Sequence, residues 1–420
     1  TYMSELTEKE KEQLGMNIQK KTAEIEERLE KERQKTVLHK IAVKDGKVEY
    51  KSRGEVPGTP LNQFSMDEHN GYFRIATTTR SLGSFGGSIG VATTQTAVKQ
   101  VTVEQTNAPE SLVSSSEGQG ITLEENQQLT KPVEQPMPTA VAPPQPERPS
   151  TLNHIYVLDE NMNIAGRLEN LAPDERIYSA RFIGDRVYLV TFRQIDPLFV
   201  IDLKDPANPK VLGKLKIPGV SDYLHPYDEN HVIGIGKEAV EAKEGNFAWF
   251  QGVKLSLFDV SDVENPKEIA KYVIGHRGTD SEALRDHKAF LFDREKKLLV
   301  IPVLLAKINE EQYPNGVPDS AYGEYTFQGA YAFELTKENG FVLRGKITHV
   351  EDDSLAKSGY YYFSPYSVKR SLYIGNNLYT LSDKMVKIND LSDLREIKSV
   401  ELPYNETTAY GGGPVGIVVE

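Results

Sequence analysis

The stretch PLFVIDLKDPANPKVLGKLKIPGVSDYLHPYDENHVIGIG, residues 197–236, contains one complete structural unit and the start of the next. Residues 198–202 form a short apolar run, and the Asp, Asn and Pro residues of 205–209 favour a turn. Residues 210–217 then alternate apolar with polar side chains before a Pro-Gly pair ends the segment. The pattern predicts a strand, a tight turn and a second strand.

This unit recurs along the chain at a period of roughly 45 residues. Between consecutive copies lie two further apolar runs, so each period carries four strands. A sheet of four short strands cannot bury both of its faces alone, and repetition at this period predicts an all-β fold, a β-propeller of four-stranded blades. A β-sandwich or a string of hairpins is the alternative, although these rarely repeat one turn phrase at such spacing. The copies span residues 39–58, 155–173, 197–217, 257–275, 332–350 and 386–403.

Several segments resemble the prokaryotic secreted β-propeller family that is distantly related to WD repeats. They are residues 61–79, 202–210, 221–236 and 281–303. The resemblance covers most of the chain apart from a low-complexity insert. It implies an extracytoplasmic propeller domain, extracellular or at the cell surface, and leaves the chemistry of that domain open.

Composition excludes several classes of partner and site. The chain has 420 residues and a net charge of −12, and such an acidic surface argues against nucleic acid as the primary partner. No apolar run reaches the length of about 18 residues that a membrane span needs. Cysteine is absent, which excludes disulfides and thiolate metal sites.

The chain divides by composition into four parts. Residues 1–36 read as a charged helix, inserted in a blade or preceding one, with sparse apolar positions among Glu and Lys. Residues 37–403 carry the propeller pattern, interrupted at 80–150 by a flexible insert rich in Ser, Thr, Gly and Pro that cannot bury enough apolar surface to fold. Residues 404–420 form a C-terminal tail.

Counting strands predicts an incomplete ring of five to six blades that is part of a larger one. Complete blades fall at about 62–170, 177–217, 222–274, 284–349 and 364–402, whereas residues 37–56 match only the third and fourth strands of another. The tail supplies at most one strand. We therefore expect upstream sequence of the same precursor to provide the missing pair and about one to three more blades, either continuous with the chain or as a bound fragment that completes a nicked propeller.

One face of the propeller is expected to carry the elaborations. Residues 237–252, 307–328 and the 80–150 insert all fall between the second and third strands of their blades, and those connections share a face with the fourth-to-first connections. Loops on a rigid scaffold are usual sites of recognition, although covering of blade edges is the alternative role. The predicted binding residues are Trp249, Phe250, His276, Arg277, Tyr360 and Tyr361.

Carboxylates gather in two fourth-to-first connections of this face. They suit Ca²⁺, which takes six to eight oxygen ligands, but no D-x-D-x-D-G loop is present, and a charge run is more often a solvated loop. No cofactor is otherwise indicated. The candidate metal ligands are Asp280, Glu282, Asp286, Asp352 and Asp353.

The candidate catalytic residues are His225, Asp222 and His287. His225 is expected at the start of an innermost strand, where it would act as a general base or, more often, tie a blade end by hydrogen bonds. No nucleophile, base and orienting group can be identified as a set. Enzymatic activity therefore stays open, with a role other than catalysis favoured.

The sequence favours a secreted or cell-surface binding scaffold that engages a protein or envelope partner through the elaborated face. A hydrolase with a polar site at the channel mouth is the alternative. Asn405 begins an N-glycosylation motif, Asn-Glu-Thr, in a turn after Pro403, which agrees with an external location.

Overall fold

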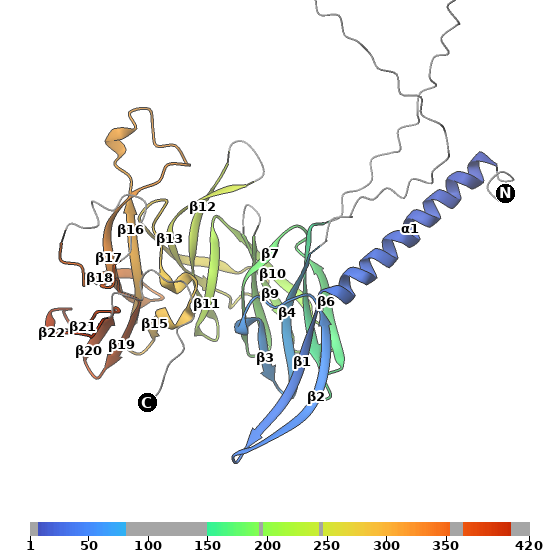
Figure 1. The fold of residues 1–420 in the computed structure, drawn as a ribbon, viewed down its shortest axis with the longest axis horizontal. Coiled ribbons are helices and arrows are strands. Elements are labelled where there is room, and N and C mark those ends of the chain that lie inside the picture. Colours follow the sequence, from blue (N-terminus) through green and yellow to red (C-terminus); the bar gives the residue numbers. More distant parts are fainter. Residues whose placement is uncertain (1–6, 81–148, 193–195, 243–246, 353–363, 405–420) are drawn as a thin grey trace, which may run out of the picture. The chain divides into compact units, whose positions relative to one another are not determined.

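The computed structural model describes residues 7–80, 149–192, 196–242, 247–352 and 364–404. In these residues one helix precedes six antiparallel sheets, of which five have four strands and one has two (Figure 1). Contacts divide the chain into a unit of residues 1–83 and 149–420 and a second unit, 84–148, which lies outside the described residues. The prediction of a propeller built from four-stranded blades is confirmed.

Helix α1 (Glu8–Arg33) leads into a half-blade of β1 (Lys35–Lys44) and β2 (Lys47–Pro57). Blade I contains β3 (Met66–His69), β4 (Tyr72–Arg80), β5 (Thr151–Leu158) and β6 (Ile164–Leu171). Blade II contains β7 (Arg176–Ile183), β8 (Arg186–Phe192), β9 (Asp196–Asp202) and β10 (Lys210–Ile217).

Blade III contains β11 (Val220–Asp228), β12 (His231–Glu241), β13 (Ala248–Asp259) and β14 (Lys267–Ile274). Blade IV contains β15 (Leu291–Asp293), β16 (Leu298–Lys307), β17 (Glu324–Thr336) and β18 (Gly340–Ile347). Blade V contains β19 (Arg370–Ile374), β20 (Asn377–Leu381), β21 (Met385–Asp390) and β22 (Glu396–Glu401). Four 3₁₀ turns are described, η2 (Gln63–Ser65), η3 (Glu282–Leu284), η4 (His287–Ala289) and η5 (Glu310–Gln312). In every blade the strands pair in chain order.

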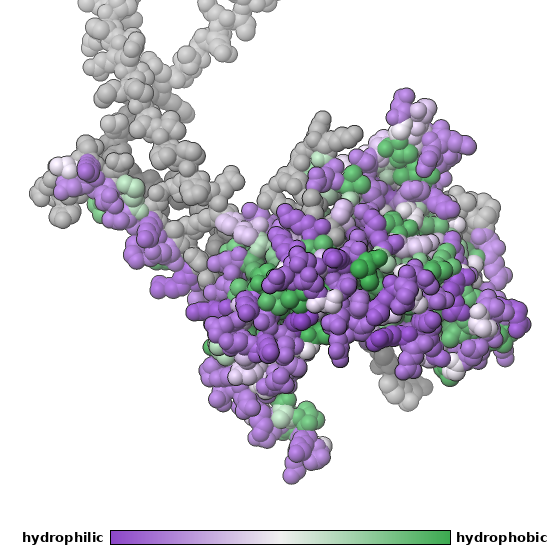
Figure 2. Space-filling view, turned by 180° about the vertical axis from the view of Figure 1, so that it is seen from behind, coloured by the Kyte–Doolittle hydropathy of each residue, from purple (hydrophilic) through white to green (hydrophobic). Residues whose placement is uncertain are grey.

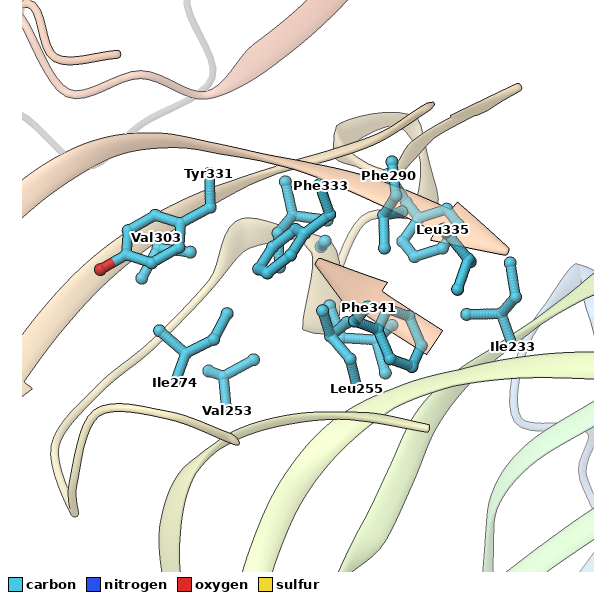
Figure 3. Packing of buried hydrophobic residues seen from close by; sticks show 14 of the residues in the cluster. Ile233, Val253, Leu255, Ile274, Phe290, Val303, Tyr331, Phe333, Leu335 and Phe341 are labelled. Carbon is cyan, nitrogen blue, oxygen red and sulfur yellow. The ribbon is translucent and has the colours of Figure 1, made fainter. Parts of the chain in front are cut away.

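The hydrophobic core lies between successive blades. Five buried clusters join the half-blade to blade I, I to II, II to III, III to IV and IV to V. Figure 3 shows Val253 and Leu255 of blade III packed with Phe333 and Phe341 of blade IV. Each such side chain removed from water stabilises the fold by about 2 kcal/mol, so the apolar alternation of the strands fixes the stacking of blades.

A small residue in the outer strand lets each blade approach the next. Gly166, Gly213, Ala270 and Gly345 occupy the same place, where the pairing of the third and fourth strands changes register. A Cβ on Gly213 would lie 2.0 Å from the Val263 carbonyl oxygen in the turn of blade III. Blade V carries Lys398 at this place, paired with Ile388.

Two of the predicted interruptions are shorter than expected. Within residues 237–252, β12 and β13 stay paired as far as Glu241 and Ala248. Within residues 307–328, β17 begins at Glu324 opposite Lys307. The polar residues in these segments favour loops in the sequence pattern. In the structure, however, the backbone pairing of β12 with β13 and of β16 with β17 continues into the segments. These connections still join second to third strands, as predicted.

Candidate functional site

Arg277 lies between two aromatic rings on the elaborated face. Its guanidinium carbon is 4.7 Å from the centroid of the Trp249 ring and 4.3 Å from that of Tyr322. Trp249 belongs to β13 of blade III, and Tyr322 lies in the connection that leads into β17 of blade IV. Arg277 itself follows β14, so three segments distant in sequence meet at one cation.

Hydrogen bonds fix this arrangement, which we call the Arg277 cluster: Phe247, Trp249, Arg277 and Tyr322. Arg277 donates from Nη1 to the Phe250 carbonyl at 3.1 Å and from Nη2 to the Tyr322 hydroxyl at 3.1 Å. Its own carbonyl accepts from the Gly323 amide at 2.8 Å. The guanidinium plane is therefore held by contacts to both elaborations.

The aromatic members of the cluster remain accessible. Tyr322 is 51% exposed and Phe247 43% exposed, and the Phe247 ring meets Trp249 edge-on at 4.9 Å. Arg, Trp and Tyr are the residue types that contribute most at protein interfaces, because they offer large rigid surfaces with a polar end. The cluster is therefore a fixed and accessible group of aromatic and cationic side chains.

The other predicted binding residues have different surroundings. Phe250 stacks on Phe192 at 5.2 Å and packs into the core between blades II and III. His276 accepts the Ile308 amide at Nδ1, 3.1 Å away, and so supports the turn before Arg277. Tyr360 and Tyr361 lie outside the described residues, as do Asp353 and Asn405.

A second candidate site is a cavity of about 230 Å³, which we call the η2–η3 pocket. It is lined by turns η2 and η3 and by the first residues of β11. Turn η2 reaches from the start of blade I to blades III and IV, where the Phe64 ring lies 5.3 Å from Tyr223 and 4.8 Å from His287. Its lining residues are Asn62, Gln63, Phe64, Asp222, Tyr223, Ala283, Leu284, Arg285 and His287.

Asp222 has an unusual electrostatic environment in this pocket. Burial raises the pKa of its carboxyl to about 7, with Lys237 opposing and Asp280 adding to the shift. Burial also lowers the pKa of Lys237, whose ammonium lies 3.7 Å from Asp280. Burial by itself would raise the pKa of the Asp280 carboxyl. The hydrogen bond from Arg285 and the charge of Lys237 outweigh burial and lower this pKa below its usual range.

Of the two predicted histidines, His287 lines the same pocket as Asp222, and His225 does not. His225 lies in the middle of β11, not at its start, and its Nδ1 is 2.9 Å from the Tyr223 hydroxyl. Burial lowers the pKa of His225 to about 4, so the ring is neutral at pH 7. His287 contacts Gln63 at 3.5 Å. Among the described residues no hydrogen bond joins Asp222 to either ring, so the geometry offers a polar cavity without an assembled base and nucleophile.

Three of the predicted metal ligands form ion pairs with arginine side chains. The Asp280 carboxylate forms an ion pair with the Arg285 guanidinium at 2.9 Å, and Glu282 pairs with the same guanidinium at 3.6 Å. Asp286 pairs with Arg370. Asp352 lies at an exposed position. In the described part of the chain no group of three or more His, Asp or Glu side chains is placed to hold an ion.

Phe64, Lys237 and Tyr322 were absent from the predicted site residues. Tyr322 lies in a recognised insertion, and Lys237 is a cation placed directly after the apolar strand VIGIG. Both features mark unusual positions. Neither shows which distant segment the side chain meets.

The family model for the β-propeller domain matches residues 2–394. The chain belongs to this β-propeller domain family. An uncharacterised protein of Methanocaldococcus jannaschii is 33% identical over 84% of this chain, and one of Archaeoglobus fulgidus is 35% identical over 65%. The propeller domain spans 39% and 30% of the lengths of these two relatives.

Solved structures similar to this propeller domain include the WD40 domain of Sif2, with a TM-score of 0.30 and 10% identity over 60% of this chain and 54% of that one. AztD from Citrobacter koseri, in the apo form, gives a TM-score of 0.33 and 11% identity over 60% and 57%. BamB from Moraxella catarrhalis gives a TM-score of 0.32 and 10% identity, over 59% of this chain and 59% of that one. In the described residues of the propeller domain, no helix combines the length and apolarity needed to cross a membrane.

Proposed function

We propose that this β-propeller domain is an extracytoplasmic binding scaffold that engages a protein or envelope partner through the Arg277 cluster. The observation that carries the proposal is the Arg277 guanidinium, which lies against both Trp249 and Tyr322, one ring from each of two elaborated connections. A propeller supplies a rigid frame, and a frame with a fixed, accessible aromatic surface is suited to binding.

The charge distribution at the cluster supports a protein partner. The chain carries a net charge of −12, and the Arg277 cluster places a cation among aromatic rings on this acidic protein. Arg277 reaches its rings and acceptors without a carboxylate partner among its described contacts. An acidic or aromatic segment of a partner would complement it.

Binding to an envelope preparation from the source cells tests the proposal. The variant Arg277→Ala with Trp249→Ala should reduce binding of the purified domain at least about tenfold. Arg294→Ala is the matched control, because the Arg294 guanidinium carbon also lies over an aromatic ring, 5.4 Å from the centroid of Tyr227. Arg294 belongs to the connection between the first and second strands of blade IV, at the opposite end of the strands from the Arg277 cluster. Equal binding by the double variant, or equal loss in the control, would contradict the proposal.

The location outside the cytoplasm rests on the family resemblance of the sequence and on the glycosylation motif at Asn405. Fractionation of source cells with an antibody against the domain provides a separate test. Signal confined to the cytosolic fraction would refute the location and leave the binding surface to be judged by its own assay.

Hydrolysis at the η2–η3 pocket is the second candidate function. The observation that favours it is the Asp222 carboxyl, whose pKa of about 7 suits acid–base catalysis at neutral pH. A panel of nitrophenyl esters and glycosides tests it. Turnover that disappears in Asp222→Asn would support this candidate, and absence of turnover by the native domain would remove it.

A further inference from the structure

The half-blade has a free edge. In the described residues β1 pairs only with β2, whereas blades I to V each contain four strands. Strand β2 leads through η2 into β3, the first strand of blade I, so β2 holds the place of a fourth strand and the missing partners belong beside β1. An unpaired strand edge leaves backbone donors and acceptors ready for another strand.

One face of the half-blade is also uncovered. Leu38 and Val56 are buried against Ile75, Tyr156 and Leu158 of blade I. Pairing of Ile41 with Tyr50 and of Val43 with Val48 places the opposite side chains together on the outward face. These residues are exposed by 39% at Val37, 55% at Ile41, 72% at Val43, 73% at Val48 and 57% at Tyr50. Figure 2 shows hydrophobic side chains at the surface of this ribbon.

Blade V has an uncovered side as well. Leu372, Ile374 and Ile397 are exposed by 40%, 62% and 50%, and every residue of β22 is exposed. At the place where blades I to IV have Gly or Ala, blade V carries Lys398. A blade placed beside blade V would therefore pack against a lysine at this place, and not against a glycine or an alanine.

A second copy of the chain also fits the β1 edge poorly. Lys35, Lys40 and Lys44 lie in this strand, and pairing two copies of β1 would gather like charges. The two relatives contain additional sequence from which another occupant of the edge could come, because this chain matches only 39% and 30% of their lengths.

We propose that two strands from a part of the same polypeptide outside residues 1–420 add to the β1 edge, and that a further blade from that part covers the outward face of Ile41, Val43 and Tyr50. The added strands run beside β1 as the first and second strands of its blade. The ring then closes through at least one blade between blade V and the half-blade. This assembly is independent of the binding role proposed for the Arg277 cluster.

Thiol labelling tests the proposal directly, because the chain contains no cysteine. Val43→Cys reports on the outward face, and Val342→Cys, 47% exposed on β18, is the matched control. We compare maleimide reaction rates in the 420-residue chain and in the whole encoded polypeptide, with any other cysteine there replaced by serine. Labelling at position 43 should slow at least about tenfold in the longer polypeptide, with position 342 unchanged.

Amide hydrogen exchange in β1 is the second measurement, and it requires no substitution. The amides of β1 that point away from β2 should gain protection only in the longer polypeptide. Full protection in the monomeric 420-residue chain would show that the chain covers its own edge. Protection that grows with concentration would identify a second copy, and exposure in both proteins would leave the edge free. Each of these three results overturns the proposal.

Discussion

The guanidinium carbon of Arg277 lies 4.3 Å from the centroid of the Tyr322 ring, although 45 residues separate them in sequence. The Trp249 ring centroid lies 4.7 Å from the same carbon. One side chain thereby joins the elaborations of blades III and IV.

Replacing Arg277 with Lys should loosen both elaborations, because lysine keeps the charge but loses the flat stacking surface and the two directed hydrogen bonds. We expect a loss of about 1–2 kcal/mol in local stability. Hydrogen exchange at residues 248–251 and 322–324 measures it. Arg294→Lys should leave these amides unchanged, and unchanged exchange in Arg277→Lys itself would show that the stack does not hold the ribbons.

Replacing Asp222 with Asn should remove a pH-dependent cost. The pKa of Asp222 is about 7 in the fold against 3.8 ordinarily, so its contribution to stability is present below pH 4 and is lost as the pH rises to about 7. Relative to wild type, the variant should be about 1–3 kcal/mol more stable at pH 8 and nearly equal at pH 4. Urea unfolding at both pH values checks this. Glu229→Gln, at an exposed turn, serves as the charge-matched control, and an identical offset in both variants would refute a specific effect.

Replacing His349 with Gln should weaken the junction of blades IV and V. Its ring contacts the Ser382 hydroxyl at 3.0 Å and the Thr380 hydroxyl at 2.8 Å, and burial lowers its pKa to about 4. The stabilisation by neutral His349 is therefore present above pH 6.5 and lost as the pH falls through about 4. The variant should cost about 1–3 kcal/mol at pH 7 and less at pH 4, as measured by denaturant unfolding. A cost that does not change with pH would contradict this account.

Replacing Gly213 with Val should disrupt the contact between blades II and III. Even the first side-chain carbon would lie 2.0 Å from a backbone oxygen, which forces the blades apart and is expected to cost more than about 2 kcal/mol. Lys398→Ala at the equivalent place in blade V should stay within about 0.5 kcal/mol. Thermal unfolding of the two variants compares them, and equal effects would show that the place has no common role.

The sequence was sufficient to predict the blades. Alternating apolar residues around a repeated turn, as in 197–217, specify strand pairing locally, and repetition specifies stacking because each sheet needs a neighbour on both faces. The charged helix, the long insert and the half-blade follow from the same local patterns and are present as α1, the break between β4 and β5, and β1–β2. Location, the glycosylation of Asn405 and the identity of a partner stay predictions.

The tertiary structure decided which side chains meet. The sequence pattern placed Trp249 and Arg277 on one face, but only the folded chain brings the Tyr322 ring to the same guanidinium. Likewise, Asp222 and His287 were named as candidates, whereas Phe64 enters their pocket from blade I. Strand alternation is a property of neighbouring residues and can be read along the chain. Contacts between connections depend on the angles at which whole blades pack, which are set by buried side chains far away in sequence.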